Sequence, residues 1–219
     1  MEAGSQPITQ QVIMKIAVFG ATGGTGRELI LQALDKGHEV TAIVRRPAAF
    51  TLTHARLRTV TGDVMKPDSF APALQHQDAV LSVIGKNSLK PMTFYRESAR
   101  NIVDQMDKAG VQRLICLTSV GVLDKPVGPL FYIWLIKPLL KNIYDDMRHM
   151  EQTIRESRLA WTIVRPSFLF DGKRTGQYRV GSSGELDHAN KISRADLANC
   201  ILDQLDTQAN WQKAIAVAY

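Results

Sequence analysis

Near the start of the chain, a short apolar run leads into three glycines spaced three residues apart, Gly20, Gly23 and Gly26. Because glycine has no Cβ atom, such a segment can turn tightly, let the backbone approach a phosphate group and pack a helix closely on a strand. The pattern is typical of a site for the diphosphate of a dinucleotide. The residues predicted to bind the diphosphate are Gly20, Thr22, Gly23, Gly24, Thr25 and Gly26.

The residues on either side of the glycines fit this prediction. Residues 16–19 have a wholly apolar strand pattern, and residues 27–36 have helical periodicity and end at Gly37. The N-terminus of that helix would present free N–H groups and a partial positive charge to the diphosphate.

Two arginines, Arg45 and Arg46, follow the second expected strand, residues 39–44. Sites that prefer NAD place an acidic residue at this point, where it accepts hydrogen bonds from the ribose hydroxyls. A guanidinium group cannot accept such bonds, but it pairs with a 2′-phosphate through its planar fork. We therefore predict NADP(H) as the cofactor and favour Arg45 for this contact. Both residues could instead be surface arginines after a strand.

Further candidates lie where later strands should end, because ligands of parallel sheets bind at the carboxyl ends of the strands. Asp63 could face the adenine amino group while the neighbouring backbone at Val64 covers the ring, although Asp63 could also be a turn residue. Gly85 and Lys86 could let the backbone approach the ribose and the diphosphate, or simply end a strand.

The strand expected at residues 113–118 ends beside the nicotinamide in this architecture. Thr118 and Ser119 stand there, so we predict contacts with the nicotinamide and name Ser119 as the candidate catalytic residue. A serine at a strand end could equally be a cap. Pro166, which we expect to end the strand at residues 161–164, completes the predicted cofactor site.

We expect the acceptor to bind in two loops, residues 121–143 and 166–190. Both loops are rich in aromatic residues, whose faces stack on flat conjugated molecules. We therefore predict a planar small molecule such as a flavin, although each aromatic residue could instead belong to the core or to a dimer surface. The candidate substrate residues are Phe131, Tyr132, Trp134, Phe168 and Phe170.

Apolar runs alternate with helical patterns along almost the whole chain. This alternation predicts an α/β fold, a single Rossmann-like domain with a doubly wound parallel sheet and helices on both faces. Further strands are expected at residues 57–61, 78–84 and 214–218, and further helices at 68–74, 93–109, 141–157 and 193–205. The last helix begins with Ser193 as N-cap and Asp196 as the acidic residue of a capping box.

The composition is that of an ordinary globular protein: 219 residues, 45% hydrophobic and 22% charged, with a formal net charge of +6. Basic residues are scattered among acidic ones, so we predict no nucleic-acid partner. Cys116 and Cys200 lie in apolar patterns, and residues 1–13 do not resemble a signal peptide, which favours a cytoplasmic protein. The apolar stretch 130–140 is too short to span a membrane.

We place the domain at residues 14–219 and interpret residues 1–13 as a flexible extension. No metal site is predicted. We expect a monomer or a weak homodimer.

Several motifs together resemble the atypical short-chain dehydrogenases with an NAD(P)H-binding domain. They lie at residues 20–26, 62–64, 118–119, 155–157, 162–166 and 192–198. The resemblance covers nearly everything from Lys15 onward and implies a Rossmann fold that binds NAD(P)H. Within this group the chain looks most like the NADPH-dependent flavin and biliverdin reductases of the biliverdin reductase B type.

Typical short-chain dehydrogenases transfer a proton with a tyrosine and a lysine four residues apart on one helix. Here Tyr132 and Lys137 are five residues apart, and Tyr144 is followed at the required spacing by Arg148. The flavin and biliverdin reductases resemble this chain in lacking the pair, and their hydride transfer requires little more than cofactor geometry.

The same resemblance assigns the 2′-phosphate to Arg45. Ala49 stands where those reductases carry a second arginine, so Arg46 would have to replace it, and Phe168 stands where they carry an active-site histidine.

These observations predict an NADPH-dependent reductase that transfers hydride to a conjugated acceptor such as free flavin, a quinone or a linear tetrapyrrole. The alternative is an NADP(H)-binding redox sensor or regulatory protein without turnover, which could signal through the stretch 130–140. A nucleic-acid-binding module has only the net charge in its favour.

Overall fold

The computed structural model describes residues 12–86, 88–124, 132–182 and 184–219. Its main sheet contains β1 (Lys15–Phe19), β2 (Glu39–Val44), β3 (Leu57–Thr61), β4 (Ala79–Ser82), β5 (Arg113–Leu117), β6 (Ala160–Pro166), β8 (Arg179–Gly181) and β10 (Lys213–Ala218). The strand order is β3-β2-β1-β4-β5-β6-β10-β8, and all neighbours are parallel except β10 and β8.

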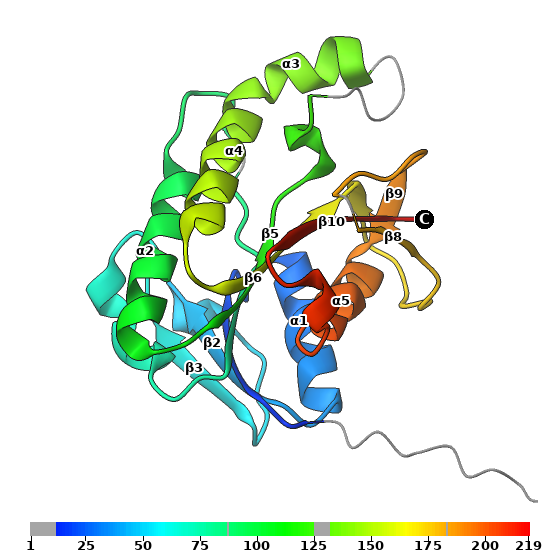
Figure 1. The fold of residues 1–219 in the computed structure, drawn as a ribbon. Coiled ribbons are helices and arrows are strands. Elements are labelled where there is room, and N and C mark those ends of the chain that lie inside the picture. Colours follow the sequence, from blue (N-terminus) through cyan, green and yellow to red (C-terminus); the bar gives the residue numbers. More distant parts are fainter. Residues whose placement is uncertain (1–11, 87, 125–131, 183) are drawn as a thin grey trace, which may run out of the picture.

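Helices cover both faces of this sheet (Figure 1). α1 (Gly24–Asp35) packs with α5 (Arg194–Asp203) on one face, and α2 (Phe94–Ala109) packs with α4 (Lys141–Glu156) on the other. The alternation of side chains along β1 supplies both cores, since Ile16 and Val18 join one and Phe19 joins the other. The predicted doubly wound α/β fold is therefore confirmed.

Three short elements near the predicted acceptor loops were not expected from the sequence. β7 (Phe168–Phe170) and β9 (Lys191–Ser193) pair as a separate parallel ribbon, and β8 adds an antiparallel edge to the main sheet. Each has only three residues, too few to show a strand periodicity. A π-helical turn (Tyr132–Ile136) and the short α3 (Lys137–Leu139) precede α4.

Two of the differences from the expected elements lie at prolines. The helix expected at residues 68–74 is instead two 3₁₀ turns, Pro67–Ser69 and Ala71–Leu74, because Pro72 has no N–H group to continue a helix. The strand expected to end before Pro166 instead includes it, and Pro166 pairs with Val217. On the other side of β6, strand β5 has already ended, so the missing N–H group breaks no bond of the sheet.

Cys116 and Cys200 are free and buried, as expected. Burial raises the pKa of each thiol to about 12, so both are protonated at neutral pH. No helix in the described part of the chain is long and apolar enough to cross a membrane. Residues 1–11 of the expected extension lie outside the described residues.

Candidate functional site

The turn between β1 and α1 requires glycine at two of its three spaced positions. Gly20 has a φ of +85°, and a Cβ atom there would lie 2.5 Å from the carbonyl oxygen of Val83. A Cβ atom on Gly26 would lie 2.2 Å from the carbonyl oxygen of Gly20. At Gly23 the nearest atom would be 3.4 Å away, at the edge of ordinary contact. Backbone packing therefore explains Gly20 and Gly26, while Gly23 leaves space open above the turn.

The N-terminus of α1 is suited to an anion. Gly23 is its N-cap, no side chain caps it, and its first turn contains no acidic residue. The first N–H groups of a helix have no partner within the helix and carry a partial positive charge. The turn and the start of α1 therefore fit the diphosphate of a dinucleotide.

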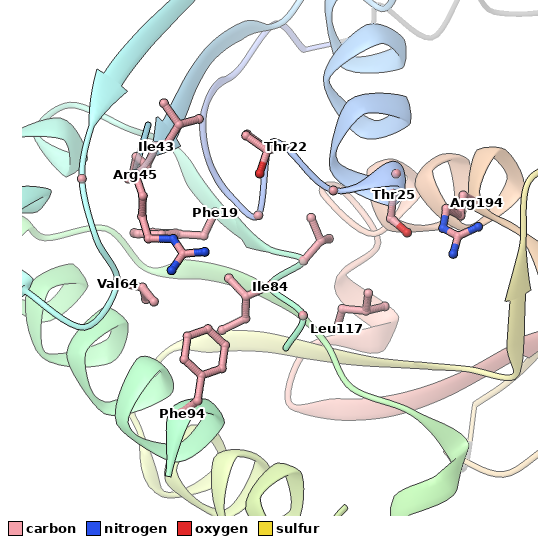
Figure 2. A pocket seen from close by; sticks show the side chains of 18 of the residues that line it. Phe19, Thr22, Thr25, Ile43, Arg45, Val64, Ile84, Phe94, Leu117 and Arg194 are labelled. Carbon is pink, nitrogen blue, oxygen red and sulfur yellow. The ribbon is translucent and has the colours of Figure 1, made fainter. Parts of the chain in front are cut away.

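A cleft of about 340 Å³ opens at the carboxyl ends of β1, β2, β4 and β5 (Figure 2). Eight predicted cofactor residues line it: Gly20, Thr22, Gly23, Gly24, Thr25, Arg45, Val64 and Gly85. Other lining residues were not predicted: Phe19, Ala21, Ile43, Val44, Gly62, Val83, Ile84, Phe94, Leu117, Leu169 and Arg194. Gly26 lies within the first turn of α1, against the backbone of Gly20 and Ala21.

Arg45 and Arg46 have different surroundings. Arg45 lines the cleft, and Figure 2 shows its guanidinium group pointing inward on the side of Val64 and Ile84. Both arginines are exposed, but Arg46 does not line the cleft. Neither forms an ion pair with a described acidic residue. Of the two arginines, only Arg45 is placed to contact a ligand in the cleft. It would not have to break an ion pair with a described carboxylate to do so.

Asp63 and Lys86 lie just outside the cleft, beside residues that line it. The Asp63 carboxylate accepts a hydrogen bond from the Met65 N–H group at 3.0 Å, which stabilises the turn that presents Val64. The Lys86 N–H group donates to the Tyr95 hydroxyl at 2.9 Å, and that hydroxyl donates back to the Lys86 carbonyl oxygen. Both residues thus help to shape the rim of the cleft.

The hydroxyl groups at the end of β5 are engaged elsewhere. Thr118 is buried, and its Oγ1 donates to Glu151 on α4 at 2.8 Å. The Ser119 Oγ accepts a hydrogen bond from the Gly121 N–H group at 3.1 Å and so acts as an N-cap. Neither residue lines the cleft, and neither does Pro166, which lies buried in β6. At this strand end the residue that reaches the cleft is Leu117.

A family model described as NAD(P)H-binding matches residues 20–208, from the first glycine of the turn to beyond α5. The chain belongs to this NAD(P)H-binding family. Its sheet and helices have the fold of the atypical short-chain dehydrogenases, so the resemblance found in the sequence is confirmed. The family therefore supports a nicotinamide cofactor for this chain.

Two proteins with similar sequences differ in how they are described. The chain is 28% identical over 212 residues to the uncharacterized protein YwnB of Bacillus subtilis, covering 88% of this chain and 92% of YwnB. It is 29% identical over 172 residues to the photosystem II assembly factor Ycf39 of Synechocystis, covering 76% of this chain but only 48% of Ycf39.

A solved structure has the same fold. ChuY from Escherichia coli O157:H7, described as an anaerobillin reductase, is similar with a TM-score of 0.77. The similarity covers 93% of this chain and 96% of ChuY at 24% sequence identity. At this identity the likeness shows the shared fold.

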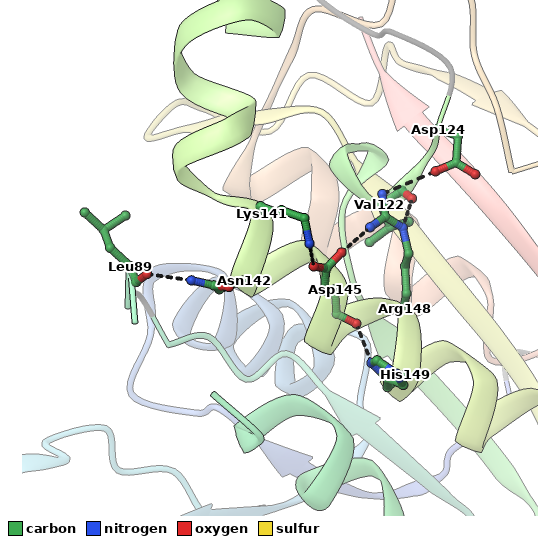
Figure 3. Close-up of polar contacts among 8 residues, drawn as sticks. All are labelled: Leu89, Val122, Asp124, Lys141, Asn142, Asp145, Arg148 and His149. Carbon is green, nitrogen blue, oxygen red and sulfur yellow. Dashed lines mark hydrogen bonds and ion pairs between the residues drawn. The ribbon is translucent and has the colours of Figure 1, made fainter. Parts of the chain in front are cut away.

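Helix α4 carries a tyrosine and an arginine at the spacing of the dehydrogenase proton-transfer pair, but neither side chain lines the cleft. Arg148 donates to the Val122 carbonyl oxygen at 2.8 Å and to Asp145 at 2.6 Å (Figure 3). Tyr144 is buried against Gly121, where a Cβ atom would lie 2.3 Å from its ring. In this family member these two residues join α4 to the turn after β5.

The three described aromatic side chains that were predicted to bind an acceptor have different surroundings. Trp134 is 79% exposed and Phe168 is 73% exposed, whereas Phe170 packs edge-on against Tyr219 with ring centroids 6.1 Å apart. None of these three lines the cleft, although Leu169, between the two phenylalanines, does. Phe131 lies outside the described residues, and for Tyr132 the structure describes only the backbone.

Three side chains of the cleft were not among the residues predicted from the sequence to contact a ligand. Phe94 begins α2, Leu169 lies in β7, and Arg194 begins α5. A signal existed for Arg194, because it belongs to the motif at residues 192–198 that carried part of the family resemblance. Nothing in the local pattern of Phe94 or Leu169 distinguishes them from core residues.

Proposed function

We propose that the protein is an NADPH-dependent reductase that transfers hydride to a planar conjugated acceptor such as free flavin, a quinone or a linear tetrapyrrole. The observation that carries the choice of NADPH is Arg45, which points into the cleft from the end of β2. A basic residue at this strand end suits a 2′-phosphate, whereas an acidic residue would suit the free ribose hydroxyls of NAD.

The lining residues suggest how the chain would hold the cofactor. The glycine turn and the start of α1 would bind the diphosphate, and Val64 would cover the adenine. Leu117 and Leu169 would form apolar walls at the end where the nicotinamide belongs in this architecture. A bound nicotinamide cofactor supplies the hydride, and the chain contributes its orientation and the exclusion of water.

Among the described residues, no tyrosine or serine lines the cleft, and this supports a conjugated acceptor. Tyr144 is buried on α4 against Gly121, the Thr118 hydroxyl donates to Glu151 on α4, and the Ser119 hydroxyl caps a turn. In the reaction NADPH + H⁺ + flavin → NADP⁺ + reduced flavin, water can supply the proton. A carbonyl substrate would instead need an acid placed beside its oxygen.

A second candidate is an NADP(H)-binding sensor without turnover. It is favoured by the exposed apolar side chains before α4, Trp134, Leu135 and Leu139, which are 79%, 64% and 56% exposed. A partner could bind such a patch. The similarity to Ycf39, whose name describes an assembly factor, points in the same direction.

A single assay separates the two candidates. Anaerobic NADPH oxidation is measured with flavin mononucleotide, a small quinone and biliverdin in turn. The reductase proposal predicts multiple turnovers with at least one of these acceptors. Tight NADPH binding without turnover on any of them would overturn the proposal and favour the sensor.

Replacement Arg45→Glu tests the cofactor preference. A charged hydrogen bond contributes about 1.5 to 3 kcal/mol, so we expect the Kd for NADPH to rise about tenfold or more, with little change for NADH. Isothermal titration calorimetry measures both constants. Arg46→Glu is the matched control, because it changes the same charge outside the cleft. Equal loss of NADPH and NADH affinity in Arg45→Glu would show that Arg45 does not contact the 2′-phosphate.

A further inference from the structure

Arg194 begins α5, but its side chain lies against the start of α1. A Cβ atom on Gly24 would lie 2.7 Å from the Arg194 Cδ atom and 3.0 Å from its Nε atom. Figure 2 shows Arg194 beside Thr25, at the end of the cleft away from Arg45. The absence of a side chain at Gly24 is what lets the arginine approach the helix N-terminus.

The charges around the cleft are few and of one sign. Among the described residues, Arg45 and Arg194 are the only charged side chains that line it, and no carboxylate does. The two arginines lie toward opposite ends of the cleft (Figure 2). This arrangement suits a ligand with two separate groups of negative charge. A dinucleotide with a diphosphate and a 2′-phosphate has that pattern.

The present partner of Arg194 holds it weakly. The Arg194 Nη1 atom lies 2.7 Å from Asp171, whose side chain is 91% exposed. An ion pair with so exposed a carboxylate contributes about 0 to 1 kcal/mol. A diphosphate at the N-terminus of α1 would offer more negative charge and more acceptor oxygens, so the guanidinium group could exchange one partner for the other.

The backbone that carries Arg194 is firmly placed. The Ser193 hydroxyl caps α5 by accepting from the Asp196 N–H group at 3.0 Å. The Gln32 side chain on α1 donates to the Ala195 carbonyl oxygen at 2.9 Å, which joins α1 directly to the first turn of α5. Arg194 and the N-terminus of α1 are therefore held together, and only the guanidinium group needs to move.

We propose that Arg194 is a further binding residue of the cofactor site, which leaves Asp171 and pairs with the diphosphate of the dinucleotide. This inference rests on the proposed cofactor function. It adds a residue for the diphosphate that is separate from the contact of Arg45 with the 2′-phosphate.

Two small ligands separate the two arginines. Adenosine diphosphate has the diphosphate without the 2′-phosphate, and adenosine 2′-monophosphate has the 2′-phosphate without the diphosphate. Calorimetry on the full chain should show that Arg194→Ala raises the Kd for adenosine diphosphate and NADPH about tenfold and leaves adenosine 2′-monophosphate within twofold. Arg45→Ala should show the opposite selectivity between the two small ligands. Arg194→Lys, which keeps the charge, should lose less than Arg194→Ala.

Asp171→Asn is the control for the alternative that Arg194 matters only through its ion pair with Asp171. It removes the same pair but leaves Arg194 free, so adenosine diphosphate should bind as tightly as to the wild type or up to threefold tighter. If Asp171→Asn weakens this ligand as much as Arg194→Ala does, or if Arg194→Ala binds it normally, the inference is overturned while the cofactor function stands. If the wild-type chain binds none of the three ligands, both proposals fail.

Discussion

The two ends of the candidate site are built in different ways. At the diphosphate end, Gly20 and Gly26 are held by backbone atoms of neighbouring elements, and the ligand would meet main-chain N–H groups. At the proposed acceptor end, the described aromatic residues lie on short elements, and two of them, Trp134 and Phe168, are mostly exposed. Backbone recognition of the cofactor tolerates changes in most side chains, whereas acceptor recognition depends on individual ones. The fold can therefore keep its cofactor while its acceptor changes.

The largest expected effect on stability is at the diphosphate end, in the glycine turn. In Gly26→Ala the new Cβ atom would lie 2.2 Å from the Gly20 carbonyl oxygen and 3.0 Å from the Ala21 Cα atom, and backbone atoms cannot move aside as a flexible side chain can. We expect a loss of about 3 kcal/mol in the free energy of unfolding, together with loss of nucleotide binding. Urea denaturation and NADPH titration measure the two effects.

Gly23→Ala and Gly85→Ala are matched controls for this substitution. The nearest atom to a new Cβ would be 3.4 Å away at Gly23, and none lies within 4 Å at Gly85. Both variants should fold, with losses of about 1 kcal/mol or less. Stability of Gly26→Ala within that range would contradict the packing argument for this end of the site.

The next largest effect is expected at Asp196, which joins α5 to the loop before β8. This buried carboxylate accepts hydrogen bonds from the Thr175 and Gly176 N–H groups, each at 2.8 Å, and from the Tyr219 hydroxyl at 2.6 Å. Replacement Asp196→Asn removes the charge, and we expect a loss of about 2 kcal/mol in unfolding free energy. Asp171→Asn, at an exposed carboxylate, should lose less than about 0.5 kcal/mol.

The effect of Asp196 should depend on pH. Burial opposes ionisation of this group, but hydrogen bonds from Tyr219, Gly176 and Thr175 outweigh it and lower its pKa below the ordinary 3.8. A carboxyl group with a lowered pKa stabilises the fold fully above its unfolded pKa and loses this contribution as the pH falls through its folded pKa. The stability difference between wild type and Asp196→Asn should thus be constant from about pH 5 to 8 and shrink below about pH 4. A difference that grows on acidification would contradict this assignment.

The contrast between the two ends also determines what the sequence could predict. The glycine turn follows from backbone requirements that fix the spacing of residue types, so Gly20, Gly26 and Arg45 could be found by pattern. The prediction of a capping box at the start of α5 was confirmed for Ser193 but not for the Asp196 side chain. Ser193 caps α5 as predicted, but the Ser193 N–H group bonds to Tyr219, because Asp196 turns to the distant Thr175 and Gly176.

The contacts that were missed join segments far apart along the chain. Arg194 meets Gly24 only because α5 packs on α1, and no local pattern encodes that approach. Phe168 and Phe170 do not line the cleft for a related reason. Side chains alternate along β7, so Leu169 faces the cleft while Phe168 and Phe170 face away from it, and a three-residue strand is too short for this alternation to be seen in advance.

The smallest expected effects on stability and on NADPH binding are at Phe168 and Phe170. These two residues test most directly whether the two ends of the site are independent. Phe168→Ala should change the unfolding free energy by less than about 0.5 kcal/mol, because the ring is 73% exposed. Phe170→Ala should lose about 1 to 2 kcal/mol, because the ring packs on Tyr219 and the Lys191 ammonium group lies 5.3 Å from its centroid. Neither variant should alter the Kd for NADPH by more than twofold, since neither ring lines the cleft.

Acceptor kinetics then decide whether Phe168 belongs to the acceptor end at all. An exposed ring that stacks on a flat acceptor adds binding energy of about 1 kcal/mol, so its removal should raise the KM for that acceptor about fivefold and leave the KM for NADPH unchanged. An equal change in both KM values would show that the two ends are coupled. An unchanged acceptor KM would remove Phe168 from the acceptor site and leave Leu169 as the residue of β7 that acts there.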